Sequence, residues 1–207
     1  NAYIAAGVYS DHECSTFENA LEKLRKGQFI MIREGTAAHN LKALMPLLTQ
    51  QYYSRCMFAT DDKHPSDLLY GGHIDYIVKQ ALKNGADPIV ALKTATHHAA
   101  RYFLLNNKGA IASGYLADIV VVDNLEDFNV ETVFKRGKLV FDGEVKDFSA
   151  PTVDEKLAEK CFDTFHLDSV TPSSFKVDGK LGLIGLVGGE LLTRNLGTAD
   201  KNDVEND

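Results

Sequence analysis

Short apolar runs that end in ionisable residues recur along the first sixty residues of the chain. The runs and the residues that end them are Val8-Tyr9 with Asp11-His12-Glu13, residues 29–32 with Arg33-Glu34, and residues 55–60 with Asp61-Asp62. Stretches with helical periodicity separate the runs. Strands buried on both faces read as continuous apolar runs, and strands that alternate with helices form parallel βα units. We therefore predict an α/β fold whose ionisable residues gather at one edge of a parallel sheet.

The stretches between these runs have the apolar spacing and the boundary residues of helices. Residues 17–26 place apolar side chains on one face and stop at Gly27, with Ser15 or Thr16 as the N-cap of a capping box that includes Glu18. The other helices that we expect span residues 1–6, 41–51, 73–84 and 88–103. Pro46 should bend or divide the helix at 41–51, and Asp87 should cap the one at 88–103.

The chain changes character after residue 106. Short β-type runs occur at 119–123, 130–134, 138–141 and 143–146, and Asp142-Gly143 is typical of a hairpin turn. Further strands are expected at 175–181 and 183–192, and residues 199–207 are polar and acidic, as in a disordered end. We therefore divide the chain into an α/β domain at 1–105, a small β module at 106–149 and a third region at 150–207.

The composition excludes several classes of protein. A net charge of −7 on 207 residues argues against non-specific nucleic-acid binding, and 44% hydrophobic with 25% charged residues is ordinary for a globular protein. No apolar run reaches the roughly 18 residues of a membrane span, so we expect no membrane association. The three widely spaced cysteines fit free thiols in the cytoplasm.

The residues after the apolar runs are of the types that bind metals or move protons. A carboxylate at a strand end can bind a metal or accept a proton from water, and Asp11 and Glu13 could orient His12 as a metal ligand. The alternative is that Asp61 and Asp62 only form a turn or a helix cap before Pro65. His97 and His98 are adjacent within an expected helix and face different directions, so we interpret them as packing and surface residues.

Several segments together resemble the bacterial-type adenine deaminases of the amidohydrolase superfamily. The segments that carry the resemblance are 3–13, 31–36, 59–65 with 72–76, 109–145 and 167–195. The resemblance implies part of a (β/α)8 barrel of the metal-dependent hydrolase type, followed by a small β-sandwich-like module. The family's first-strand His-x-His, its bridging carboxylate and its fifth-strand histidine have no counterpart here. We therefore expect an internal fragment that lacks the first barrel strands and the end of the C-terminal region, inactive in isolation.

The resemblance also implies an activity and roles for individual residues. The reaction is the hydrolytic deamination of adenine to hypoxanthine and ammonia, with a divalent metal, manganese or iron, while zinc would also fit. His12 and Asp61 would bind the metal, Asp61 would be the general base, and Glu34 would be a second catalytic residue. The residues left for substrate binding are Arg33, Asp62 and Glu13, with Asp62 as the alternative base. A homo-oligomeric full-length enzyme is expected.

Two other interpretations remain open at this point. One is a different cyclic amidohydrolase, dihydroorotase-like or imidazolonepropionase-like. The other is an inactive fragment that only self-associates, because the open strand edges of a partial barrel are templates for pairing.

Overall fold

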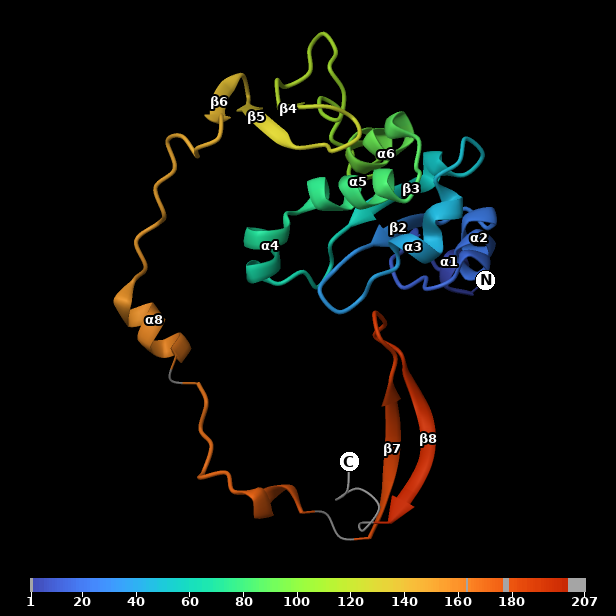
Figure 1. Ribbon diagram of the computed structural model, residues 1–207, viewed down its shortest axis with the longest axis vertical. Helices are drawn as coiled ribbons and strands as arrows, with labels where there is room; N and C mark the ends of the chain where they lie inside the picture. Colours follow the sequence, from blue (N-terminus) through green and yellow to red (C-terminus); the bar gives the residue numbers. More distant parts are fainter. Residues whose placement is uncertain (1, 163, 177–178, 201–207) are drawn as a thin grey trace. The chain divides into compact units, whose positions relative to one another are not determined.

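The computed structural model describes residues 2–162, 164–176 and 179–200 (Figure 1). The chain divides into two compact units. The first extends to Lys146 and includes Gly188–Leu191, and the second comprises the described residues from Asp147 to Val187 and from Leu192 onward. Each unit is described by itself.

A parallel sheet of three strands lies at the centre of the first unit, in the order β1-β2-β3. The strands are β1 (Ser10–Asp11), β2 (Phe29–Arg33) and β3 (Cys56–Ala59). Ser10 lies opposite Phe29, and Ile30 lies opposite Cys56. The prediction of parallel βα units is confirmed, but β1 begins two residues later than expected, because Tyr9 contributes only its carbonyl oxygen, which accepts from the Phe29 amide at 2.9 Å.

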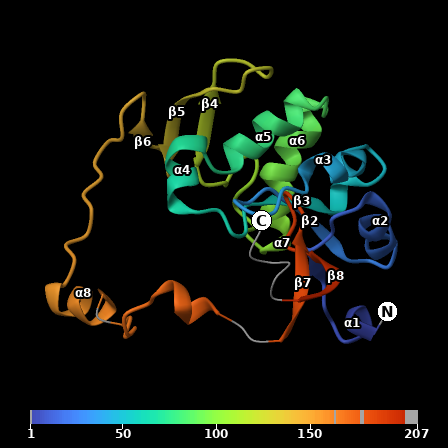
Figure 2. The same cartoon turned by 60° about the horizontal axis from the view of Figure 1, so that its bottom comes forward.

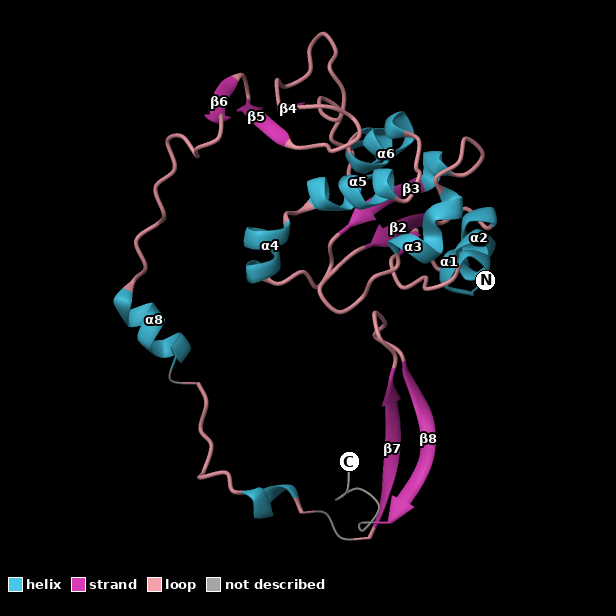
Figure 3. Cartoon of the chain, in the orientation of Figure 1, coloured by secondary structure: helices cyan, strands magenta, loops and turns pink. Residues whose placement is uncertain are grey.

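Helices alternate with these strands along the chain (Figure 3). The α-helices of this unit are α1 (Ala2–Ala5), α2 (Phe17–Arg25), α3 (Leu41–Leu44), α4 (Pro65–Gly71), α5 (Ile74–Lys83), α6 (Pro88–Ala95) and α7 (His97–Tyr102). Two short 3₁₀ helices, η1 (Met45–Leu47) and η2 (Tyr53–Arg55), precede β3.

The helix boundaries follow local chemistry. Thr16, one of the two residues predicted as the cap, caps α2, and its hydroxyl accepts from the Asn19 amide at 3.3 Å. The predicted capping box with Glu18 is wrong, because the third helical position after Thr16 is Asn19. Pro46 divides the helix expected at 41–51, because proline removes a backbone donor and only a 3₁₀ turn continues past Leu44. Asp87 caps α6 as predicted, and its Oδ1 accepts from the Val90 amide at 3.0 Å.

The continuous helix expected at 88–103 is wrong, because the chain breaks at Thr96. The backbone of Thr96 has φ −123° and ψ −76°, outside the helical region. Its hydroxyl donates to the carbonyl oxygen of Leu92 at 2.7 Å, which gives the side chain a local hydrogen bond of the kind that competes with helix continuation. His98 lies in the buried part of α7, and its Nδ1 lies 3.1 Å from the carbonyl oxygen of Cys56, in agreement with its interpretation as a packing residue.

The core of the first unit lies between the sheet and the helices that contact it. Figure 2 shows α5 and α6 side by side, and both contact β3, as α7 does, whereas α2 and α3 contact β2. The largest fully buried apolar side chains are Ile30, Ile32, Leu44, Leu47, Met57, Ile77 and Val90. This packing fixes the carboxyl ends of β2 and β3, from which the candidate site residues extend.

The β module is a single antiparallel sheet with the order β4-β5-β6. Its strands are β4 (Ile119–Val122), β5 (Val130–Lys135) and β6 (Lys138–Phe141). The run expected at 143–146 is not a strand, since only an isolated bridge joins Phe141 to Val145. A sandwich arrangement therefore stays a prediction.

The second unit contains α8 (Glu155–Phe162), the 3₁₀ helix η3 (Pro172–Phe175) and a hairpin of β7 (Lys180–Leu186) and β8 (Thr193–Asp200). The strands expected at 175–181 and 183–192 are wrong in their bounds, because the glycines at 188 and 189 lie in the turn between the strands. The disordered end expected from 199 overlaps β8, and residues 201–207 lie outside the described part. Among the helices described, none is long and apolar enough to cross a membrane.

Candidate active site

The ionisable residues predicted from the sequence follow the carboxyl ends of the three parallel strands. Because the strands are parallel and adjacent, these ends lie at the same edge of the sheet. The structure joins three of the six residues, Glu13, Arg33 and Asp61, into one cluster. The other three, His12, Glu34 and Asp62, make different contacts.

Arg33 is the centre of the cluster, and only 1% of its side chain is exposed. Its Nη1 lies 3.0 Å from Oδ2 of Asp61 and 3.1 Å from Oε2 of Glu13. Its Nε donates to Oδ1 of Asn40 at 3.2 Å. Two carboxylates and an amide therefore compensate the buried guanidinium charge, which is the arrangement that a buried ion needs.

Asp61 occupies an unusual backbone conformation at the turn after β3. Its φ is +47°, in the left-handed region that non-glycine residues seldom adopt. About a third of its side chain is exposed, so the carboxylate lies at the surface of the cluster and not beneath it. Strained backbone of this kind is found preferentially at functional sites.

His12 lies beside Glu13, and the side chains of both residues are exposed. Its Nε2 lies 3.3 Å from Oε1 of Glu13, so Glu13 contacts both His12 and Arg33. The preceding residue, Asp11, pairs with Lys23 at 2.6 Å. Burial raises the pKa of Asp11, but the hydrogen bond from Lys23 and the Glu13 amide more than offset it, so that pKa is lowered.

Glu34 points to a different set of groups from its neighbour Arg33, as alternate residues of a strand do. Its Oε1 lies 2.9 Å from Nδ1 of His39, and its Oε2 accepts from the Leu41 amide at 3.2 Å. Both oxygens are thus used within the segment that leads into α3. The structure gives Glu34 a role in holding this segment.

Asp62 folds back onto the loop that follows β2. Its Oδ2 accepts from the Ala37 amide at 2.8 Å, whereas its Oδ1 is buried without a hydrogen-bond partner among the described residues. Burial raises the pKa of Asp62, but its backbone hydrogen bonds outweigh that effect and lower the pKa. Asp62 therefore connects the two loops, whereas Asp61 carries the exposed carboxylate.

The residues present do not by themselves form a metal site. Within residues 2–162, 164–176 and 179–200, no group of three or more His, Cys, Asp or Glu side chains is placed to hold a metal ion. His12 contacts Glu13, and Asp61 is paired with Arg33.

Described residues of the first unit line at least two cavities. One, of about 510 Å³, is next to the loop after β2 and is lined by polar and aromatic groups that include Thr36, His39, Lys63, Asp67 and Tyr76. Lys63 is engaged in this cavity, since its Nζ lies 4.1 Å from the centre of the Tyr76 ring.

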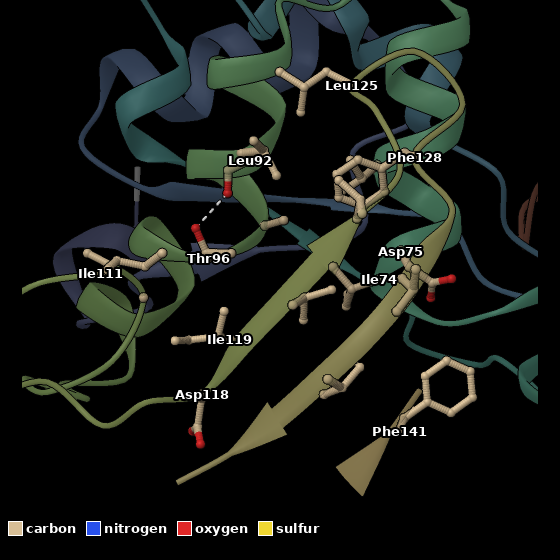
Figure 4. A pocket seen from close by; sticks show the side chains of 18 residues that line it. Ile74, Asp75, Leu92, Thr96, Ile111, Asp118, Ile119, Leu125, Phe128 and Phe141 are labelled. Atoms are coloured by element: carbon tan, nitrogen blue, oxygen red, sulfur yellow. Dashed lines mark hydrogen bonds between the residues drawn. The ribbon is translucent and has the colours of Figure 1, made fainter. Parts of the chain in front are cut away.

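The larger cavity, of about 780 Å³, is lined mainly by apolar side chains of α5, α6 and the β4–β6 sheet (Figure 4). The two carboxylates that line it, Asp75 and Asp118, are both engaged in hydrogen bonds with neighbouring groups. This cavity therefore offers space and apolar surface but little reactive chemistry.

Sequence reasoning missed Asn40, which is fully buried and fixes the edge of the Arg33 guanidinium. Its position seven residues after Arg33 gives no periodic signal, because the chain turns between β2 and α3. In the structure, an isolated antiparallel bridge between Glu34 and His39 closes this turn.

Comparison with known proteins shows similarity over most of the chain. A family model described as "Amidohydrolase family" matches residues 2–140. An adenine deaminase of Kosmotoga olearia is 48% identical over 171 residues, which are 75% of this chain and 30% of the relative. A protein of Carboxydothermus hydrogenoformans described as adenine deaminase 2 is 43% identical over 198 residues, 94% of this chain and 34% of the relative. The chain thus spans about a third of the length of these curated relatives.

A solved structure supports the fold. The β-aspartyl dipeptidase of Fervidobacterium islandicum, solved in complex with a β-Asp-Leu dipeptide, superposes with a TM-score of 0.54 and 24% identity. The match covers 68% of this chain and 41% of that protein. At this identity the likeness concerns the fold alone.

Proposed function

The chain belongs to the amidohydrolase family, and from this membership we propose that it is part of an enzyme that hydrolyses adenine to hypoxanthine and ammonia. Support comes from the relatives, since those with 38–51% identity are described as adenine deaminases. They favour this reaction over the hydrolysis of a cyclic amide. The assignment of roles to particular residues rests on the Arg33 cluster. This cluster holds the partly exposed carboxylate of Asp61 at the edge of the sheet.

The proposed chemistry uses Asp61 as the group that moves protons. Water adds to C6 of the purine, which forms a C–O bond, and the carboxylate of Asp61 takes the proton that the water loses. The same proton then passes to the exocyclic amino group, the C6–N bond breaks, and ammonia leaves. A carboxylate that is partly exposed but anchored at one oxygen is suited to this transfer, and Asp61 fits this requirement better than Asp62, whose Oδ2 is bonded to the loop backbone.

Membership of the family implies a divalent metal. We propose manganese or iron, with zinc as an alternative, and His12 and Asp61 as two of its ligands. His and carboxylate ligands suit these ions. The remaining ligands would have to come from residues other than those described here.

Other roles follow from the contacts in the cluster. We propose that Glu13, which bridges His12 and Arg33, contacts the substrate through its exposed face. Glu34 and Asp62 hold loops, so we assign them a supporting and not a chemical role. Association of the full-length enzyme into a homo-oligomer is part of the proposal, and light scattering on that enzyme would test it.

A chimera tests the proposed function. In the Kosmotoga olearia relative, the segment that matches this chain is replaced by this chain, and ammonia release from adenine is measured with added manganese. The proposal expects activity in the chimera, loss of at least about a hundredfold on Asp61→Asn, and a smaller loss on Asp62→Asn. A folded, metal-containing chimera that releases no ammonia while the parent does would contradict it. The isolated chain, assayed in parallel, is expected to be inactive.

A further inference from the structure

We infer that Arg33 is a positioning residue for Asp61 and does not bind the substrate. This inference rests on the proposed function, because it concerns the residue that we assign to proton transfer. It replaces the expectation from the sequence that Arg33 contacts the substrate. The observations that carry it are the burial of Arg33, the number of chain segments that hold it, and the backbone of Asp61.

Burial separates the guanidinium from any ligand. The side chain is 1% exposed, whereas the two carboxylates that contact it, Glu13 and Asp61, are 58% and 34% exposed. A substrate at this edge of the sheet would meet the two carboxylates before it met the guanidinium. The charge of Arg33 therefore acts on a ligand through its neighbours.

Three separate segments fix the orientation of the guanidinium. Its Nη1 contacts Glu13, which follows β1, and Asp61, which follows β3, while its Nε donates to Asn40, which precedes α3. A planar guanidinium held at both edges has little freedom to rotate. The guanidinium therefore holds any carboxylate that it binds in a fixed position.

Asp61 needs such a fixed partner. Its left-handed backbone is strained, and strained conformations persist only where the surrounding structure enforces them. Arg33 holds Oδ2, whereas none of the hydrogen bonds among the described residues involves Oδ1. The ion pair thus anchors one oxygen and leaves the other for a proton or a ligand.

Glu13 adds a second reason for a cation at this position. Glu13 and Asp61 each bring an oxygen to within 3.1 Å of the same nitrogen atom. Without the guanidinium, these two carboxylates would repel each other across a partly buried space. Removal of Arg33 should therefore displace Asp61 as well as release it.

The activity test uses Arg33→Met and Arg33→Lys in the active chimera, with Arg25→Met as a matched control at an exposed arginine near the end of α2. We expect Arg33→Met to lower kcat by about a hundredfold or more with KM changed less than about threefold, because a displaced base affects the chemical step. Arg33→Lys should restore part of kcat, and Arg25→Met should leave both constants unchanged. A rise in KM with kcat preserved would show substrate binding and overturn the inference.

A second measurement does not depend on activity. Urea unfolding midpoints are compared for Arg33→Met, Asp61→Asn and the double variant, all in the isolated chain. If Arg33 holds Asp61, the two substitutions are non-additive, and the double variant unfolds at a higher urea concentration than the sum of the single shifts predicts. Additive shifts would overturn the inference. Non-additive shifts in the isolated chain, together with a folded, metal-containing chimera that releases no ammonia, would instead contradict the proposed function and leave the Arg33–Asp61 contact established.

Discussion

A Cβ atom placed on Gly35 would lie 1.7 Å from Oδ1 of Asp62 and 2.9 Å from the carbonyl oxygen of Thr60. Non-bonded atoms do not approach so closely, so the loop after β2 can pass the loop after β3 only because residue 35 has no side chain. The same approach allows Asp62 to accept the Ala37 amide. The packing of these two loops therefore depends on one glycine.

Gly35→Ala should destabilise the first unit by about 1–3 kcal/mol, the usual cost of forcing extra atoms into a filled space. The added methyl group would displace the Asp62 carboxylate and break its hydrogen bond to Ala37. Urea unfolding followed by circular dichroism measures the change. Gly71→Ala is the control, because a Cβ on Gly71 meets no atom within 4 Å, and a similar loss in both variants would refute the steric explanation.

Stability should fall as pH drops below the ordinary pKa of histidine, in part through His98. Burial is the main cause that lowers the pKa of His98, with the charges of His97 and Lys93 in the same direction, against the opposing hydrogen bond to Cys56. Because the unfolded state binds the proton more readily, protonation below about pH 6.5 favours unfolding. Above that pH the imidazole of His98 is neutral in both the folded and the unfolded state, so it does not change the unfolding free energy with pH.

Unfolding free energies at pH 7.5 and 5.5 test this for the wild type, His98→Gln and the half-buried neighbour variant His97→Gln. The pH dependence should be smaller in His98→Gln, whereas His97→Gln, which removes only a lesser cause of the lowered pKa of His98, should retain most of it. An unchanged dependence in His98→Gln would assign the effect to other groups.

The three cysteines should differ widely in their rates of alkylation. Burial raises the pKa of Cys14 to about 11, and burial with the neighbouring Cys14 raises that of Cys56 to about 12. At pH 8 only about one molecule in a thousand would carry a Cys14 thiolate, and fewer would carry a Cys56 thiolate. Cys161 is exposed, so iodoacetamide should label it first, as peptide mass spectrometry would show. Equal labelling of all three in the folded protein would contradict the burial of Cys14 and Cys56.

Arg136→Asn should stabilise the turn between β5 and β6 by roughly 0.5–1 kcal/mol. Arg136 and Gly137 have φ of +51° and +76°, and asparagine tolerates a positive φ better than arginine does. The Arg136 amide would still donate to Asp118. Thermal unfolding measures the gain, and Lys138→Asn is the control for loss of a charge outside the turn. No gain beyond that of the control would show that the turn is not strained by Arg136.

The parallel arrangement of β1, β2 and β3 could be predicted because buried strands and amphipathic helices have distinct periodicities. Local rules also placed the cap at Asp87 and the division at Pro46. The break at Thr96 could not be predicted, since threonine is tolerated within helices and only the contact of its hydroxyl with Leu92 marks the end of α6. Helix α4 was missed because its short sequence lacks an apolar stripe.

The positions of the site residues could be predicted from strand ends, but their contacts could not. Sequence shows that Arg33 and Glu34 follow the same strand, yet alternation sends one to Asp61 and the other to His39. Likewise, the choice between Asp61 and Asp62 depends on a turn in which only Asp62 reaches the Ala37 amide. Such assignments depend on tertiary contacts with loops whose course is set by the whole unit.

Strand β1 contains only two residues, and side chains supply much of what holds it. Ser10 and Tyr102 are joined through their hydroxyls at 2.7 Å, and Gln28 donates to the carbonyl oxygen of Val8 at 3.0 Å. Segments with few backbone bonds open locally at a lower free energy than the rest of a protein. We therefore expect amide hydrogens near Ser10 to exchange with solvent before those of β2, and an opening there would withdraw Glu13 from Arg33 without directly breaking the contact of Arg33 with Asp61.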